Sequence, residues 1–368
     1  MPRTHLFVAP GNAAFGELLL GLRLARELHA AGDRVVFLAP RSHRMLLEHT
    51  PFDHGAIDPV LPMLDRALPG VIRDRACDSV VLLDLLSTLL VLEKHRIEPA
   101  FLDELGVTTH ALDIWDLARS DLLFDMCDAQ MTLRESARTL VPRRLVPVPF
   151  ARPDAAGAYC ALPEVTTADD RAATRAELGL ATGDRLVMFT TAQFQSRGLT
   201  AFQTRAVAEI PARILDACLA ADPRVHVAHV GPRALAQDSA RYHHLPQMVP
   251  ARFEQVMRAS DLLLTPNQAA TGISLALALD VPALAVIGES TQYKFRVFPL
   301  GLHAFMAPAL DHNAYTDAVP AIDVAALAGA LHAEIFDDTT RTERQRTRRA
   351  YVDAIRRLPT GRAVMDRA

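Results

Sequence analysis

Short apolar runs alternate along the chain with longer stretches whose apolar residues recur every three or four positions. The runs carry few polar residues, which is typical of strands that helices cover on both faces. The first half has four such runs, at 5–9, 34–39, 79–84 and 107–113. A second series has runs at 185–192, 225–231, 261–266 and 281–287, with helical stretches at 201–221, 250–260 and 270–279. This alternation predicts an α/β protein with two Rossmann-like βαβ domains and parallel sheets.

The helix predicted over residues 17–31 has a clear apolar face. That face carries Leu18, Leu22, Ala25 and Leu28. Gly32 follows, and a glycine at this place predicts a left-handed residue that ends the helix.

A change of composition near residue 143 divides the chain. Between 143 and 183 prolines cluster and the apolar periodicity is lost, which is typical of a connector between domains. The tail over 322–357 is helical in pattern and ends in a basic stretch, which we interpret as a solvated final helix. We therefore expect a first domain, a linker, a second domain and a C-terminal closing helix, over residues 1–150, 151–183, 184–335 and 336–368. Whether that helix packs back on the first domain is left open.

Composition and charge exclude several classes of function. The 368 residues are 50% hydrophobic, which suffices for two cores. A net charge of −4 gives no bias toward nucleic acid or anionic membranes. No apolar run approaches the ~20 residues of a membrane span, and the first residues lack a signal-peptide pattern. The four cysteines have neither metal-ligand nor disulfide spacing, so we expect reduced thiols, no metal and a cytoplasmic location.

The turn after the first predicted strand brings an acid to the mouth of a helix. Its sequence, P-G-N-A-A-F-G-E, lacks the third glycine of a G-x-G-x-x-G dinucleotide fingerprint and ends in Glu17. A carboxylate in a partly desolvated site has a raised pKa and becomes an effective base. The alternative is that the helix dipole alone favours an acid there, by roughly 0.3–1 kcal/mol. Asn12 and Phe15, in the same turn, are candidate ligand contacts.

Further polar side chains follow other predicted strands. Asp84 ends the third strand of the first half, and Asp113, Trp115 and Asp116 stand at the end of the fourth. Open α/β sheets bind ligands outside the carboxyl ends of their strands, so these four are candidate ligand contacts. Core packing is an equally good interpretation of Trp115.

The segment PNQAATGIS, residues 266–274, follows a strand and opens a helix. The free N–H groups and the dipole of a helix N-terminus favour anions, so this segment is a candidate phosphate site. Its candidate donors are Asn267, Gln268, Thr271, Gly272 and Ser274. The alternative is a satisfied N-cap on a core helix. We expect the loop after the first strand of the second series to face the same phosphates, through Thr191, Gln193 and Arg197.

Three local patterns follow one another in an order that a known family shares. The opening P-G-x-x-x-x-G-E-…-LARELHAAGDRVVFLAP is similar to G-H-V-x-P-…-LA-x-x-L-x-x-x-G-H-x-V, with Gly16-Glu17 where that pattern has Gly-His. The segment from HLPQMVPARF to GESTQ, residues 244–292, resembles PQ-…-ADLVVTHGGAGT-x-x-EAL-…-DQ. The stretch AELGLATGDRLVMFTTAQF resembles the entry into a second domain. Together the patterns resemble the GT-B nucleotide-sugar glycosyltransferases of families 1 and 28, over nearly the whole chain.

The resemblance implies an inverting, metal-independent transfer of a sugar from a nucleotide-diphosphate sugar to a small acceptor, in a cleft between the domains. Glu17 stands where the family's histidine takes the acceptor proton. Asp113 or Asp116 would orient this base or contact the acceptor, and Asn12, Phe15, Asp84 and Trp115 would line the acceptor site. Gln247, Met248 and Val249 would meet the nucleotide base, and Gln292 the sugar hydroxyls. No resident cofactor is implied.

Three departures from the family pattern leave the donor open. Leu275 replaces the acid that accepts the ribose hydroxyls, Asn267 begins the segment that replaces H-G-G, and Thr291 replaces the Asp of D-Q. They favour two alternatives: other nucleotide-linked chemistry, such as epimerisation or coupling, or an auxiliary protein without turnover. The Arg- and Ala-rich composition suits a bacterial natural-product tailoring enzyme. The expected partners are a small-molecule donor and acceptor, with the oligomeric state left open.

Overall fold

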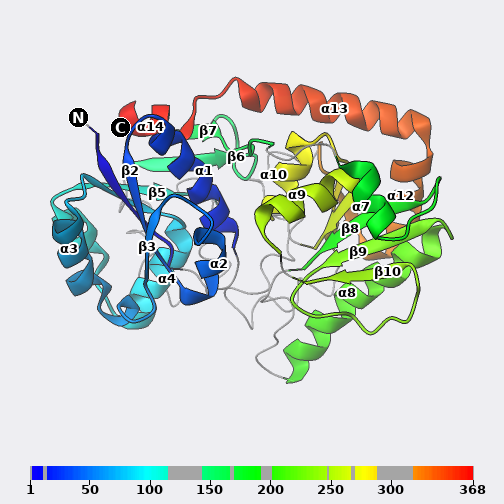
Figure 1. The fold of residues 1–368 in the computed structure, drawn as a ribbon, viewed down its shortest axis with the longest axis horizontal. Helices are drawn as coiled ribbons and strands as arrows, with labels where there is room; N and C mark the ends of the chain where they lie inside the picture. The colour runs from blue at the N-terminus through cyan, green and yellow to red at the C-terminus, as the bar shows by residue number, and fades with distance from the viewer. Residues whose placement is uncertain are drawn as a thin grey trace. The chain divides into compact units, whose positions relative to one another are not determined.

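The computed structural model describes residues 2–10, 15–114, 143–165, 170–191, 201–246, 248–266, 270–287 and 318–367. The chain forms two compact units. The first unit is Met1–Ala161 with Ile355–Ala368, and the second is Leu162–Ala354. Each contains one parallel sheet with helices packed against it (Figure 1). The predicted α/β class with two Rossmann-like domains is therefore confirmed.

The sheet of the first unit has seven strands among the described residues, in the order β3-β2-β1-β4-β5-β6-β7, and all neighbours are parallel. The strands are β1 (Thr4–Val8), β2 (Arg34–Ala39), β3 (Asp53–Ala56), β4 (Ser79–Leu82), β5 (Thr108–Leu112), β6 (Arg144–Val148) and β7 (Ala158–Cys160). The α-helices are α1 (Gly16–Ala30), α2 (Arg44–Leu47), α3 (Leu64–Arg75), α4 (Leu85–His95) and α14 (Gly361–Arg367). The strand order reverses between β1 and β4.

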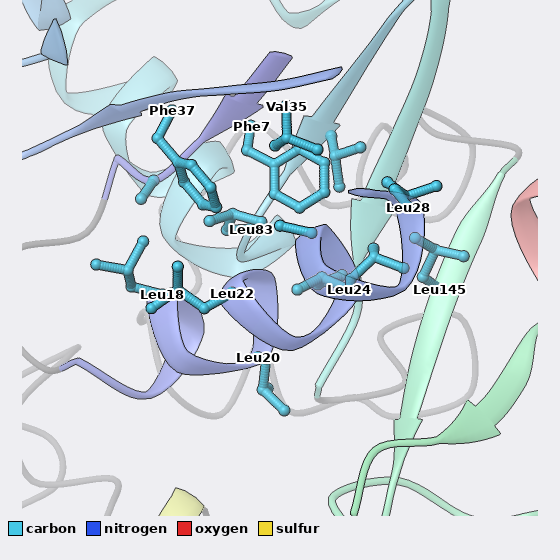
Figure 2. Packing of buried hydrophobic residues seen from close by; sticks show 14 of the residues in the cluster. Phe7, Leu18, Leu20, Leu22, Leu24, Leu28, Val35, Phe37, Leu83 and Leu145 are labelled. Atoms are coloured by element: carbon cyan, nitrogen blue, oxygen red, sulfur yellow. The ribbon is translucent and has the colours of Figure 1, made fainter. Parts of the chain in front are cut away.

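Helix α1 forms the centre of the first core. Its predicted apolar face is buried, and Figure 2 shows Leu18 and Leu22 on the side of the helix that faces Phe7 and Phe37. The helix ends as the sequence predicts, because Gly32 has φ +91° and its N–H donates to the carbonyl of His29 at 2.9 Å.

The C-terminal helix α14 packs on α1, β6 and β7 within the first unit. Gly361 begins the helix, and a Cβ there would lie 2.8 Å from Leu24 Cδ1 and 3.2 Å from the Tyr159 ring. The backbone N–H of Cys160 donates to the carbonyl of Pro359 at 2.9 Å. The proline-rich stretch that begins near residue 143 thus contains β6 and β7, two strands that the loss of apolar periodicity did not indicate.

The sheet of the second unit has six strands among the described residues, in the order β10-β9-β8-β11-β12-β13, again all parallel. The strands are β8 (Arg185–Thr190), β9 (Val225–Val230), β10 (Tyr242–Leu245), β11 (Leu262–Thr265), β12 (Ala283–Ile287) and β13 (Ala321–Asp323). The α-helices are α7 (Arg171–Glu177), α8 (Ala201–Ala221), α9 (Pro250–Ala259), α10 (Thr271–Ala278), α12 (Leu327–Phe336) and α13 (Asp338–Arg356). The order reverses between β8 and β11.

The helical tail differs from the single solvated helix that its charge pattern predicts. It consists of α12, α13 and, beyond them, α14. Most charged side chains of α13 are exposed, but Arg348 is only 5% exposed and lies 3.8 Å from a carboxylate oxygen of Asp280. Charge alone did not indicate this buried position, because it depends on how α13 packs within the second unit.

Candidate functional site

Two buried acids lie where the strand order of the first unit reverses. The carboxyl ends of β1 and β4 are neighbours at this point. Glu17 lies in the first turn of α1, which follows β1, and Asp84 follows β4. Their exposed fractions are 8% and 6%. Ligands of open parallel sheets bind at such reversals, so the structure brings these two predicted site residues together where a ligand is expected.

Glu17 combines burial with an unsatisfied oxygen. Its Oε1 atom has no hydrogen-bond partner among the described residues. Burial, and after it the negative charge of Asp84, raise the pKa of Glu17 from 4.5 to about 8, although a hydrogen bond to its backbone opposes the rise. A carboxyl group with such a pKa exchanges its proton near neutral pH, as a general base must.

Asp84 is anchored at the start of α4. Ser87 donates to its carboxylate through Oγ at 2.6 Å and through the backbone N–H at 3.2 Å. The Thr88 hydroxyl donates to the Asp84 carbonyl oxygen at 2.7 Å. The carboxylate therefore caps the helix, and these bonds fix its charge in the position from which it acts on Glu17.

Asp113 and Phe15 are also placed at this end of the first sheet. Asp113 follows β5, is fully buried, and lies 3.4 Å from Arg144 Nη1, which compensates the burial of its charge. The Phe15 ring meets the His43 ring edge-on, with centroids 4.8 Å apart. Three further predicted contacts of this unit lie outside the described residues: Asn12, Trp115 and Asp116.

In the second unit, Thr191 directly follows β8 at the reversal point. Its Oγ1 atom lies 2.9 Å from Nε2 of His229, whose Nδ1 lies 2.9 Å from the Tyr242 hydroxyl. The same hydroxyl accepts a hydrogen bond from the backbone N–H of Leu235 at 2.8 Å. Burial lowers the pKa of His229 to about 4, so the ring is neutral at ordinary pH. Sequence reasoning identified Thr191 but missed His229 and Tyr242, whose contact depends on the pairing of β9 with β10.

The amino end of α10 lies on the other side of the same reversal. Its N-cap residue, Ala270, has no side chain that caps the helix, and its carbonyl accepts from the Ile273 N–H at 2.9 Å. Among the described residues, the N–H groups of Thr271 and Gly272 are therefore the ones open to a further acceptor. Thr271 and Gly272 are half-buried. Ser274 is buried, and its hydroxyl donates to the Thr271 carbonyl at 2.8 Å. The proton of the Ser274 hydroxyl is thus already used within the helix, which makes this residue the weakest of the predicted phosphate donors in α10.

The segment predicted to meet a nucleotide base leads into α9. Val249 is the N-cap of α9 and is 38% exposed, and its carbonyl accepts from the Phe253 N–H at 3.1 Å. Met248 precedes it and is half-buried. The remaining predicted donor contacts lie outside the described residues: Gln193, Arg197, Gln247, Asn267, Gln268 and Gln292.

The described residues also bear on metal sites, membrane spans and disulfides. In the part of the chain that the structure describes, no group of three or more His, Cys, Asp or Glu side chains could hold a metal ion. Across the same residues, no helix combines the length and apolar character that crossing a bilayer requires. Of the four cysteines, the three within the described residues are free thiols: Cys77, Cys160 and Cys218.

Solved structures with the same fold cover essentially the whole chain. The glycosyltransferase SnogD from Streptomyces nogalater is 13% identical, with a TM-score of 0.60 over 100% of this chain and 98% of that chain. The spinosyn rhamnosyltransferase SpnG, complexed with thymidine diphosphate, is 14% identical, with a TM-score of 0.58 over 99% of each chain. A putative UDP-N-acetylglucosamine 2-epimerase from Listeria monocytogenes is 12% identical, with a TM-score of 0.55 over 98% and 92%. At such identities the likeness establishes the fold, which is GT-B.

Sequence comparison gives a family but no activity. No curated protein matches the chain significantly. A model of a protein family matches residues 24–292 and 289–368, and that family is described as a family of unknown function, DUF6365. The chain therefore belongs to the DUF6365 family and is a diverged relative, in fold, of the GT-B glycosyltransferases.

Proposed function

We propose that this protein is an inverting, metal-independent glycosyltransferase that moves a sugar from a nucleotide-diphosphate sugar to a small hydroxyl- or amine-bearing acceptor. The observation that carries the proposal is Glu17. It is a buried carboxyl at the strand reversal of the first unit, with one oxygen unpartnered among the described residues and a pKa near 8. A bacterial natural-product acceptor belongs to this proposal, because the relatives in fold include SnogD from Streptomyces nogalater and the spinosyn rhamnosyltransferase SpnG. A cytoplasmic setting belongs to it as well, because the cysteine spacing suits reduced thiols.

The reaction is a single displacement in which Glu17 acts as the base. The carboxylate takes the proton of the acceptor O–H or N–H while the acceptor atom forms a bond to the anomeric carbon. The bond from that carbon to the phosphate oxygen breaks, and the nucleoside diphosphate leaves with the electron pair. Attack from the face opposite the leaving group inverts the anomeric carbon. No metal is needed if protein groups stabilise the charge on the leaving group.

In this proposal the leaving diphosphate is stabilised by the second unit. The first N–H groups of α10 and the Thr191 hydroxyl lie at adjacent strand ends and donate to acceptor oxygens. Met248 and Val249 precede α9 and offer backbone groups to a base edge. Asp113 is paired with Arg144, and its proposed role is to position the acceptor side of the site.

Nucleotide binding tests the proposal directly. A ligand that binds the folded protein raises its free energy of unfolding, by about 2.7 kcal/mol when the ligand concentration is 100 times Kd. The melting temperature rises as a result. We expect UDP, dTDP, GDP or CDP to raise the melting temperature, and the matching nucleoside without phosphates to raise it less. If none of the four diphosphates shifts the transition, the glycosyltransferase proposal fails.

A second candidate is other nucleotide-linked chemistry, such as epimerisation of the sugar on its nucleotide. Leu275 favours it, because a leucine cannot accept the ribose hydroxyls as the family's acid does. The structural relative described as a putative UDP-N-acetylglucosamine 2-epimerase has the same fold. Incubation with a nucleotide sugar and no acceptor separates the two: an epimerase changes the sugar while it remains on the nucleotide, whereas a transferase leaves it intact.

A further inference from the structure

Three side chains form a hydrogen-bonded chain across three neighbouring strands of the second unit. Tyr242 lies in β10, His229 in β9, and Thr191 follows β8. The distances are 2.9 Å from the Tyr242 hydroxyl to His229 Nδ1 and 2.9 Å from His229 Nε2 to Thr191 Oγ1. This series of hydrogen bonds ends at Thr191, at the carboxyl end of β8, where the strand order reverses.

The direction of these hydrogen bonds follows from counting protons. The Tyr242 hydroxyl already accepts the Leu235 N–H at 2.8 Å, so its own proton is best used on His229 Nδ1. A neutral imidazole that accepts at Nδ1 carries its proton on Nε2, and that proton is donated to Thr191 Oγ1. The Thr191 hydroxyl then receives one proton and has its own proton left to donate. Within the described part of the chain, no acceptor takes this proton.

The surroundings of His229 hold this arrangement in place. The residue is fully buried, and its ring stacks on Phe189 with centroids 5.1 Å apart. His244, the neighbouring imidazole at 5.6 Å, is bound through Nε2 to the Gly231 carbonyl at 3.0 Å. Burial first, and then His244, lower the pKa of His229, so its ring stays neutral and keeps a single proton. Any side chain at position 231 would collide with Thr191 Oγ1 and the His229 ring, so glycine is required for this packing.

We propose that Tyr242 and His229 are positioning residues that fix the Thr191 hydroxyl as a hydrogen-bond donor to an anionic oxygen at the carboxyl end of β8. The inference rests on the proposed function, in which that oxygen belongs to the diphosphate of the donor. A hydroxyl that accepts the His229 N–H on one of its two lone pairs has its proton directed away from His229, which favours ligands that accept, such as phosphate oxygens.

The tautomer of His229 is the first test, because it can be read without any ligand. We expect ¹⁵N NMR of the full chain at pH 7 to show a neutral His229 ring protonated on Nε2, with the signal assigned by its loss in His229→Gln. In Tyr242→Phe the Nδ1 acceptor loses its donor, so the tautomer preference should weaken. A wild-type ring protonated on Nδ1 would overturn the proposal, because Thr191 would then have to donate to His229.

Binding of inorganic pyrophosphate and of the nucleoside diphosphates, measured by calorimetry, is the second test. We expect Thr191→Val to weaken binding of both about tenfold or more, Thr191→Ser to restore it, and Tyr242→Phe to weaken it by a smaller factor. Tyr351→Phe is the matched control, since the Tyr351 hydroxyl has no hydrogen-bond partner among the described residues. It should bind as the wild type does.

The outcomes separate this inference from the proposed function. If pyrophosphate binds and depends on Thr191 while no nucleoside diphosphate binds, the positioning of Thr191 stands and the glycosyltransferase proposal fails. If nucleoside diphosphates bind equally well to the wild type and to Thr191→Val, the positioning inference is wrong and the proposed function survives. If the wild type binds neither probe, both are wrong.

Discussion

The carboxyl groups of Glu17 and Asp84 form an interacting pair at the strand reversal of the first unit. Glu17 lies in the helix that follows β1, and Asp84 lies between β4 and α4. Burial and, after it, the charge of Asp84 raise the pKa of Glu17 to about 8. A folded protein that holds such a group is less stable with the carboxylate charged than with it neutral, and functional sites commonly retain groups of this kind.

The contribution of Glu17 to the stability of the first unit should therefore fall as the pH rises. Glu17 has a folded-state pKa above its ordinary value of 4.5, so its neutral form favours folding. This contribution is fully present below about pH 4.5 and is lost as the pH rises toward 8. Glu17→Gln keeps the shape and removes the titration. At pH 8 we expect the variant to be more stable than the wild type, by at most about 4 kcal/mol, with the difference shrinking toward pH 5.

Urea unfolding at several pH values, followed by far-UV circular dichroism, measures this difference. Asp103→Asn, at an exposed acid of the same unit, is the matched control for the loss of a carboxylate. A Glu17→Gln variant that is less stable than the wild type at pH 8 would show that the charged carboxylate does not destabilise the folded protein.

Turnover should depend on the same titration. If Glu17 is the base, kcat/KM rises about tenfold per pH unit below 8 and levels off above it. Glu17→Gln should lower turnover by on the order of 10²–10⁴ above pH 8, and the difference should shrink at lower pH, where the wild-type carboxylate is protonated. Asp84→Asn removes the like charge, so the inflection should move to lower pH while activity at high pH is largely kept. An unchanged profile in Glu17→Gln would leave the helix dipole as the reason for an acid at this position.

Much of the fold was predictable because each central strand is a continuous apolar run. A strand covered by helices on both faces is apolar along its whole length, whichever strands it pairs with. This pattern predicted β1, β4, β8 and β11. β7 is three residues long and follows a stretch rich in proline, so it has no periodicity to detect. The return of α14 to the first unit depends on the close approach of Gly361 to Leu24 and Tyr159, which no local pattern records.

In the candidate site, the residues next to strand ends were predictable and the residues inside strands were not. Glu17 and Asp84 stand next to strand ends, and topology alone places such residues at one edge of a sheet. His229 and Tyr242 lie 13 residues apart inside strands, and only the register of β9 against β10 brings them together. The pKa of Glu17 likewise depends on how completely packing excludes water, which the sequence does not state.

Packing beneath the site gives a prediction that needs no ligand. A Cβ at Gly21 of α1 would lie 2.6 Å from Leu83 Cδ1, and Leu83 is fully buried beside α1 (Figure 2). Gly21→Ala should overpack this contact, which costs about 1–3 kcal/mol of stability. Alanine has a higher helix propensity than glycine, and this offsets about 1 kcal/mol of that cost. Leu83→Ala alone should cost about 2–5 kcal/mol. In the double variant the new methyl group fills part of the space, so the two costs should sum to more than the measured loss.

Gly70→Ala is the matched control for this cycle. Gly70 also lies inside a helix, α3, but a Cβ there meets no atom within 4 Å. We expect the substitution to stabilise the first unit by up to about 1 kcal/mol, and to be additive with Leu83→Ala. Strict additivity of Gly21→Ala with Leu83→Ala in urea unfolding would contradict the contact.

A negative charge introduced at the amino end of α10 should affect anion binding and protein stability in opposite directions. Gly272 lies in the first turn, and a Cβ there would sit 3.6 Å from Phe253 Cζ, an ordinary contact, so a side chain fits. Gly272→Asp should keep or raise the melting temperature, because an acid near a helix N-terminus is worth about 0.3–1 kcal/mol. It should weaken nucleoside diphosphate binding at least tenfold, because the new carboxylate repels the phosphates. Gly272→Asn has the same shape without the charge and should retain most of the affinity, as calorimetry can show. Equal affinities of the Asp and Asn variants would mean that the diphosphate binds elsewhere and that α10 serves only the core.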